Sequence, residues 1–163
     1  MNRIAIIGIS ASGKSEFARK LADKTGLPLV HMDQLFWKGD WEEVPETEYL
    51  KNHREIIQQD KWIIEGYIEE SMADRLKRAD QIIYLDYPGW LCAFWSIKRW
   101  FNHRREARPE LPKQALEKFK HDTFWKILFR KERIRIEQSL ILAGNPNVVR
   151  FDSPNELKSF LNQ

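Results

Sequence analysis

The chain has 163 residues, of which 42% are apolar and 31% are charged, with a formal net charge of +3. This composition is typical of one folded globular domain and excludes a disordered chain. No apolar run is long enough to cross a bilayer and no secretory leader precedes the first strand, so we expect a cytoplasmic protein. The single cysteine excludes an internal disulfide, and the small positive charge suits a protein that binds anionic small molecules.

Strands and helices are predicted to alternate along the chain. The expected strands are residues 3–7, 27–33, 61–68, 81–87 and 147–151. The expected helices are residues 15–24, 46–59, 70–79, 88–106 and 113–142, with a last short helix capped by Ser153. Such alternation indicates an α/β fold, in which a parallel sheet carries helices on both faces.

A glycine-rich loop follows the first strand. Residues 8–15 are GISASGKS, which matches G-x-x-x-x-G-K-[ST] and opens a helix, as a P-loop must. Backbone N–H groups of such a loop and the helix N-terminus bind phosphate, while Lys14 would reach the β- and γ-phosphates and Ser15 would bind Mg²⁺. We therefore predict a site for a nucleoside triphosphate with Mg²⁺. The predicted nucleotide-binding residues here are Gly8, Ser10, Ala11, Ser12, Gly13, Lys14, Ser15 and Glu16.

Two acidic residues are expected near the metal. Asp33 and Glu65 each end a predicted strand, and open parallel sheets bind ligands at the carboxyl ends of their strands. Both are candidates to orient the water ligands of Mg²⁺, with a turn or helix-cap role as the alternative for each. Asp86 also ends a strand, but it precedes a helix that begins at Pro88, so we interpret it as a cap.

Basic residues gather between the two long predicted helices. One group consists of Arg99, Arg104, Arg105 and Arg108, and the second of Arg130, Lys131, Arg133 and Arg135. Arginines on a closing flap can neutralise a transferring phosphoryl group, whereas the alternatives are a solvated basic face or a nucleic-acid surface. Trp90, Phe94, Ile97 and Phe101 form an apolar helical stripe, which we expect to pack against the protein. The four histidines have no metal-ligand spacing.

The chain resembles the adenylate-kinase-like P-loop kinases, and among them the bacterial topology-modulation proteins. The stretches that carry this resemblance are LPLVHMDQLFWKGDW, WIIEGYI and RLKRADQIIYLDYP, together with the arginine-rich segment. The resemblance implies a three-layer αβα sandwich with strand order 2-3-1-4-5. It also implies one P-loop kinase domain over residues 1–163, with an acceptor-binding insert at about 36–60 and a helical lid at about 104–131.

The same resemblance assigns further residues to the site. Ser153 and Pro154 would lie near the adenine, and Asp33 and Trp37 would lie on the acceptor side, with Trp41 near the insert. The tryptophans would either stack on a base or pack the insert. The chain departs from nucleotide kinases where it has Glu65 for Asp and no early arginine after it, where it has Gly89 for Arg, and in its lid. Arg54 and Arg75 are the possible replacements for the missing acceptor-phosphate arginines.

Three functions remain open from the sequence. The first is an ATP-dependent kinase acting on a nucleotide, and the second is a kinase for a small hydroxylated metabolite, with Asp33 acting on the acceptor hydroxyl. The third is an ATP-binding regulator that acts on DNA with little catalysis, which a net charge of +3 supports only weakly. For transfer, the predicted catalytic residues are Lys14, Asp33, Arg104, Arg108 and Arg130, and the predicted Mg²⁺ site consists of Ser15, Glu65 and Asp33.

Overall fold

The computed structural model describes residues 1–66, 71–108, 111 and 113–161 of the chain. One parallel sheet is built from β1 (Arg3–Gly8), β2 (Leu29–His31), β5 (Trp62–Glu65), β6 (Gln81–Leu85) and β7 (Val148–Phe151). The order across the sheet is β2-β5-β1-β6-β7. Counted along the chain, these five strands have the predicted order 2-3-1-4-5. β1 lies in the middle, paired with β5 and β6, which explains its uninterrupted apolar sequence.

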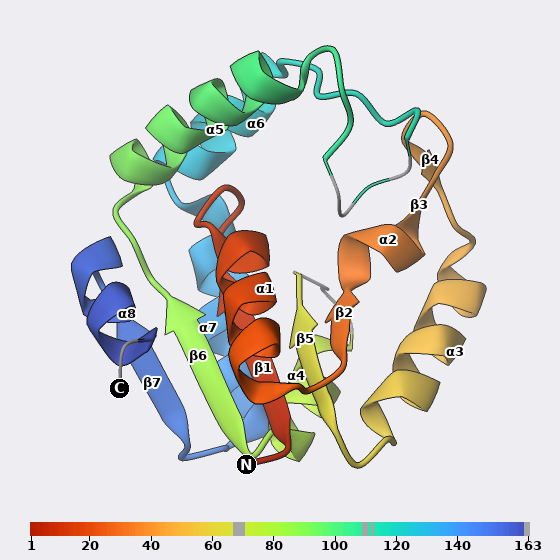
Figure 1. The fold of residues 1–163 in the computed structure, drawn as a ribbon, viewed down its shortest axis with the longest axis vertical. Helices are drawn as coiled ribbons and strands as arrows, with labels where there is room; N and C mark the ends of the chain where they lie inside the picture. The colour runs from red at the N-terminus through yellow and green to blue at the C-terminus, as the bar shows by residue number, and fades with distance from the viewer. Residues whose placement is uncertain (67–70, 109–110, 112, 162–163) are drawn as a thin grey trace.

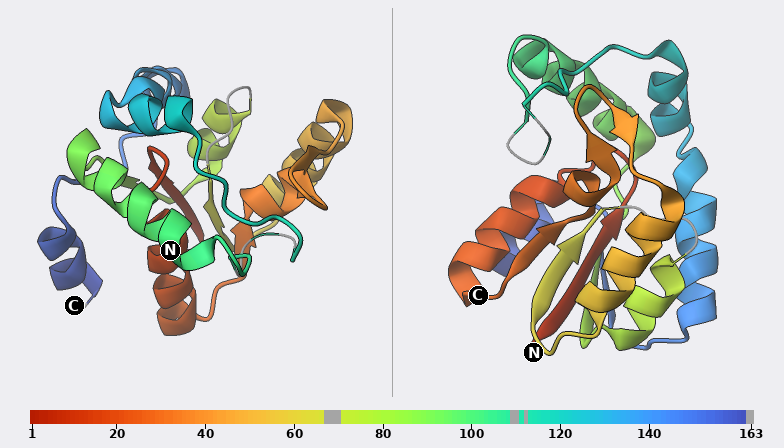
Figure 2. Two further views of the ribbon diagram at one scale, coloured as in Figure 1. Left: turned by 90° about the horizontal axis from the view of Figure 1, so that it is seen from above. Right: turned by 90° about the vertical axis from the view of Figure 1, so that its right-hand side faces the viewer.

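Helices cover both faces of the sheet, which gives the predicted three layers (Figure 1). On one face lie α1 (Lys14–Thr25) and α8 (Pro154–Leu161), and on the other lie α4 (Met72–Arg78) and α7 (Lys131–Ala143), as both views of Figure 2 show. α1 turns Phe17, Ala18 and Leu21 into the core. Ser153 caps α8 as predicted, because its hydroxyl accepts a hydrogen bond from the Glu156 N–H at 3.4 Å.

A small unit follows β2 at the edge of the sheet. It consists of α2 (Met32–Phe36), a hairpin of β3 (Trp37–Lys38) and β4 (Glu42–Glu43), and α3 (Glu46–Ile57). The predicted strand over residues 27–33 is therefore too long, and Asp33 lies in the first turn of α2. The rings of Phe36, Trp37, Trp41 and Tyr49 meet edge to face, which holds this unit together.

The prediction of one helix over residues 113–142 is wrong. Residues 114–120 are not helical, and the rest is divided into α6 (His121–Leu128) and α7 by Arg130, whose φ of 53° is left-handed. Backbone groups that would form the hydrogen bonds of a helix here are bound instead by residues far away in the sequence. The Leu116 carbonyl accepts a hydrogen bond from the Trp41 indole at 2.7 Å, and the Glu117 N–H donates to the His103 carbonyl at 3.2 Å.

α6 packs beside α5 (Gly89–His103), above the carboxyl end of the sheet (Figure 1). Gly89 permits this close packing, because a Cβ there would lie only 2.0 Å from the Leu128 carbonyl oxygen. The absence of Arg at this position thus has a steric reason.

The apolar stripe on α5 does not pack inward as predicted. Trp90, Phe94, Ile97 and Phe101 are 41% to 65% exposed, whereas Gly89, Cys92 and Ala93 are the buried residues of α5. The buried face of α5 carries small residues, and α6 approaches it closely at Gly89, so the large side chains lie outward. Within the described residues, no helix has the length and apolar character needed to cross a membrane.

Candidate active site

The P-loop lies between β1 and α1, at the carboxyl end of the central strand. Gly8 has a φ of 154°, and a Cβ there would lie 2.6 Å from the Leu85 carbonyl oxygen, so only glycine fits. Ala11 and Gly13 also have positive φ, of 60° and 85°. These turns coil the loop over the start of α1, whose N-terminal N–H groups and dipole attract phosphate.

The lysine and serine of the motif both contact groups in the site. Lys14 is 9% exposed, and its Nζ donates to the Ile9 carbonyl oxygen at 2.8 Å, within the loop itself. The Ser15 hydroxyl donates to Glu65 Oε1 at 3.0 Å. The carboxylate of Glu16, one residue further, is engaged on the helix surface by Lys20 at 2.6 Å. The loop residues Ser10, Ser12 and Gly13 line the cleft above the P-loop that is described below.

Glu65 is the buried acid of the site. It is 2% exposed and hydrogen-bonds His31 Nδ1 at 2.7 Å as well as Ser15. Burial acts to raise the pKa of Glu65, but the hydrogen bond from His31 and the charge of Lys14 outweigh it, so the pKa is lowered. Glu65 is therefore an anion at neutral pH, directly beside the P-loop serine.

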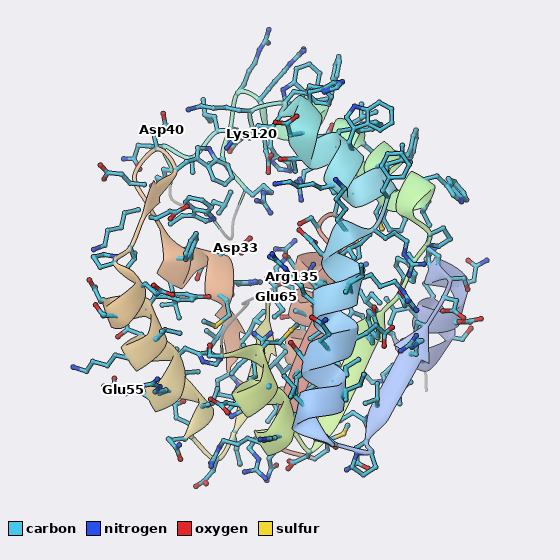
Figure 3. All side chains as sticks on the ribbon, turned by 180° about the vertical axis from the view of Figure 1, so that it is seen from behind. Asp33, Asp40, Glu55, Glu65, Lys120 and Arg135 are labelled. Carbon is cyan, nitrogen blue, oxygen red and sulfur yellow. The ribbon has the colours of Figure 1, made fainter. Side chains whose placement is uncertain are left out.

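Asp33 faces the same place from the insert. Its pKa is raised because the half-buried carboxyl group is partly desolvated and because Glu65 carries a negative charge nearby, while Arg108 and Lys14 act in the opposite direction. Figure 3 shows Asp33 and Glu65 close together at the centre of the molecule. Two carboxyl groups and one hydroxyl are the oxygen ligands that Mg²⁺ prefers, and their mutual repulsion favours a cation between them. Ser15, Glu65 and Asp33 thus fit the predicted Mg²⁺ site chemically.

A cleft of about 1340 Å³ runs from the P-loop to the insert and under α5. The insert contributes Phe36, Trp37, Trp41 and Tyr49 to its wall, so the aromatic rings that pack the insert also line the cleft. Packing of the insert by Trp37 and Trp41 is confirmed, and their stacking on a base stays a prediction. Pro154 lines the cleft beyond the P-loop, together with Leu157 and Leu161 of α8.

Two arginines near the end of α5, Arg99 and Arg108, form ion pairs with the buried carboxylate of Glu117. Arg108 lies 2.7 Å and Arg99 3.3 Å from Glu117 Oε1, and all three residues line the cleft. Arg104 lies elsewhere, because its guanidinium stacks over the Phe101 ring at 4.1 Å, on the exposed stripe of α5. Of the two lid arginines predicted first for catalysis, only Arg108 lines the cleft.

Two arginines of the second basic group bind Asp86. Arg130 and Arg133 form ion pairs with this carboxylate, and Arg150 joins them at 3.0 Å. Asp86 does not cap α5, whose start has no side-chain cap, so its interpretation as a cap is wrong. The reason is electrostatic, since an 8% exposed carboxylate must be neutralised and three guanidinium groups are within reach. Arg130, predicted as catalytic, is held here.

Known structures share this fold. A shikimate kinase from Acinetobacter baumannii in complex with shikimate superposes with a TM-score of 0.61 and 16% identity, covering 99% of this chain and 92% of that one. A sugar kinase from a Janibacter species gives a TM-score of 0.55 and 17% identity, over 99% and 93% of the two chains. No protein-family model and no curated protein matches the sequence. The chain has the fold of P-loop kinases.

Three contacts of the candidate site were not predicted from the sequence. The first is the pair of His31 and Glu65, which the place of His31 at the end of β2, in register with Glu65 of β5, could have indicated. Glu117 and Glu132 lie in segments where acidic residues look like ordinary surface charges. Their partners, Arg99 and Arg108 for the first and the P-loop for the second, become neighbours only through the fold.

Proposed function

We propose that the protein is a kinase that transfers the γ-phosphoryl group of Mg-ATP to a hydroxyl group of a small acceptor. One observation carries this proposal: a single cleft is lined both by the P-loop, with Lys14 and Ser15, and by a half-buried carboxyl group, Asp33, from the insert. Two solved structures of the same fold are a sugar kinase and a shikimate kinase by name, which supports a hydroxylated acceptor.

The chemistry follows from the placement of these groups. The loop amides and Lys14 hold the β- and γ-phosphates, and Asp33 accepts the proton of the acceptor hydroxyl as its oxygen attacks the γ-phosphorus. The bond from that phosphorus to the β–γ bridging oxygen breaks, and ADP leaves. A raised pKa makes Asp33 a stronger base than an ordinary aspartate. In this scheme Ser15 and Glu65 are the residues that would hold Mg²⁺, which supplies positive charge to the phosphate oxygens when it is bound. Asp33, which also fits the metal site chemically, serves the acceptor instead.

Arg99 and Arg108 take the role of lid cations in this scheme. They line the cleft on the α5 side, and Glu117 fixes their guanidinium groups. Positive charge held in place before the reaction stabilises the charge that spreads over the transferring group.

A nucleotide acceptor is the second candidate. The observation in its favour is the aromatic wall of Trp37, Trp41 and Tyr49, because flat rings can hold a base by stacking. Against it stands Asp33, since a carboxylate beside the attacking group suits a neutral hydroxyl better than an anionic phosphate.

The test is a transfer screen with Mg-ATP and two panels of acceptors, nucleoside monophosphates and small hydroxylated metabolites. Lys14→Ala serves as the blank, and Asp33→Asn is compared with the native enzyme on any acceptor found. We expect transfer to a hydroxylated metabolite, a loss of about 10³-fold or more in Lys14→Ala, and a loss of about 10²–10⁴-fold in Asp33→Asn with little change in ATP affinity. Transfer to a nucleotide that is insensitive to Asp33→Asn would select the second candidate. Slow hydrolysis without transfer would favour an ATP-binding regulator.

A further inference from the structure

The P-loop is in contact with an acidic residue from the far end of the chain. Glu132, in the first turn of α7, accepts a hydrogen bond from the Ser10 N–H at 2.6 Å through Oε2. Its other oxygen, Oε1, lies 2.8 Å from the Ser10 hydroxyl, which donates to it. A carboxylate thus binds both polar hydrogens that Ser10 offers, and Glu132 lines the cleft at this point.

Ser10 lies where the terminal phosphate of a nucleotide would be bound. Lys14 is the residue that reaches the β- and γ-phosphates in a P-loop, and its Nζ lies on the carbonyl oxygen of Ile9, the neighbour of Ser10. The β-phosphate has its own amide donors at the start of α1, next to Gly13 and Lys14. The Ser10 N–H and hydroxyl are therefore left for the outermost phosphate, and Glu132 satisfies them with the same kind of oxygen.

α7 does not depend on this contact for its position. Arg133, in the same turn, binds Asp86 and Glu137, while Ile136 and Ser139 are buried against the rest of the protein. Arg130 and Arg133 also flank Glu132 in sequence, yet its carboxylate binds Ser10. The Glu132 carboxylate is therefore not needed to pack α7, and its position is explained by the two hydrogen-bond donors of Ser10.

We propose that Glu132 competes with the terminal phosphate for Ser10 and thereby sets the affinity and the phosphate-length preference of the nucleotide site. The proposal rests on the proposed function, because it assumes that the P-loop binds a nucleoside triphosphate. ATP displaces the carboxylate from Ser10, since two anions do not share one pair of donors. The site therefore binds ATP more weakly than the P-loop alone would.

The experiment measures binding in the absence of any acceptor, so that it is independent of transfer. Calorimetric dissociation constants are compared for ADP and for a non-hydrolysable ATP analogue, both with Mg²⁺. The variants are Glu132→Gln, which keeps the size and loses the charge, and Glu132→Ala, which removes the contact. Glu137→Gln is the matched control, because Glu137 lies on the same helix and pairs with Arg133 and Arg150 but not with the P-loop. Thermal melting of each empty variant verifies that it is folded.

We expect both Glu132 variants to bind the ATP analogue about tenfold more tightly than the native protein, which corresponds to about 1.4 kcal/mol. ADP affinity should change less than about threefold, and Glu137→Gln should leave both constants unchanged. Equal or weaker binding of the analogue by folded Glu132→Gln and Glu132→Ala would overturn the proposal and leave the kinase function standing. If the native protein and all variants fail to bind either nucleotide, both the kinase function and the role of Glu132 are refuted.

Discussion

His53 should make the folding stability of this protein depend on pH. The residue lies on α3 with its side chain fully buried, and neither ring nitrogen has a hydrogen-bond partner among the described residues. Burial, and then the charges of Arg75 and Arg54, lower its pKa to about 3. The folded protein therefore keeps His53 neutral over the whole range in which an exposed histidine takes up a proton.

The size of the effect follows from the two pKa values. The unfolded chain protonates His53 with a pKa of about 6.5, so it binds more protons than the folded chain between about pH 6.5 and pH 3. Stability from this residue is complete above pH 6.5 and is lost progressively as the pH falls toward 3. Between pH 8 and pH 5 the loss is about 2 kcal/mol. At pH 5 the folded form is still neutral, so this figure depends on the unfolded pKa alone.

Urea unfolding at pH 8, 7, 6 and 5 would measure this term. His53→Phe and His53→Gln both remove the titration, and each has its own packing cost that is constant with pH. We expect the stability difference between the native protein and each variant to shift by about 2 kcal/mol in favour of the variant from pH 8 to pH 5. Parallel pH profiles for the native protein and both variants, within the error of linear extrapolation, would refute the reasoning.

Two further predictions concern packing and the lid cations. Gly89→Ala should lower the free energy of unfolding by about 3 kcal/mol in urea titrations, because its Cβ would meet the Leu128 oxygen at 2.0 Å, where ordinary contacts begin at 3.4 Å. Gly144→Ala, in open space with a φ of +60°, should cost only about 1 kcal/mol, and an equal loss in both variants would contradict the steric explanation. In steady-state kinetics on an identified acceptor, Arg108→Ala should lower turnover about 10²-fold with little effect on ATP binding, whereas Arg104→Ala should leave both within about twofold. Loss of turnover in Arg104→Ala, with none in Arg108→Ala, would show that Arg104 and not Arg108 acts on the transferring group.

The sheet could be predicted because its strands are continuous apolar runs ended by glycine, aspartate or proline, a pattern that depends on the neighbours of each residue in sequence. The lid could not be predicted in the same way. Residues 113–142 have a helical pattern, but the left-handed Arg130 and the bond from Trp41 to Leu116 decide the structure there. Such contacts join segments far apart in the sequence, and local helix preference yields to them.

In the candidate site, too, the parts encoded by neighbouring residues could be predicted, and the parts that depend on distant contacts could not. The P-loop is contained in eight consecutive residues, so its position could be predicted from the motif, while the roles of Lys14 and Ser15 stay predictions. Glu65 was placed correctly beside Ser15, since parallel strands bring their carboxyl ends to one edge. The partners that hold charges in place were missed, because Glu132 lies 122 residues from Ser10 and the Asp86 cluster draws on three separate segments.

Contacts between the insert and residues 116–118 cover part of the cleft. The Trp41 indole donates a hydrogen bond to the Leu116 carbonyl oxygen at 2.7 Å, and Lys118 forms an ion pair with Asp40 at 3.0 Å. The hydrogen bond and the exposed ion pair together contribute about 1.5 kcal/mol to this contact. Through it, two segments that lie 75 residues apart in the sequence, the insert and the chain that follows α5, form one wall over the cleft.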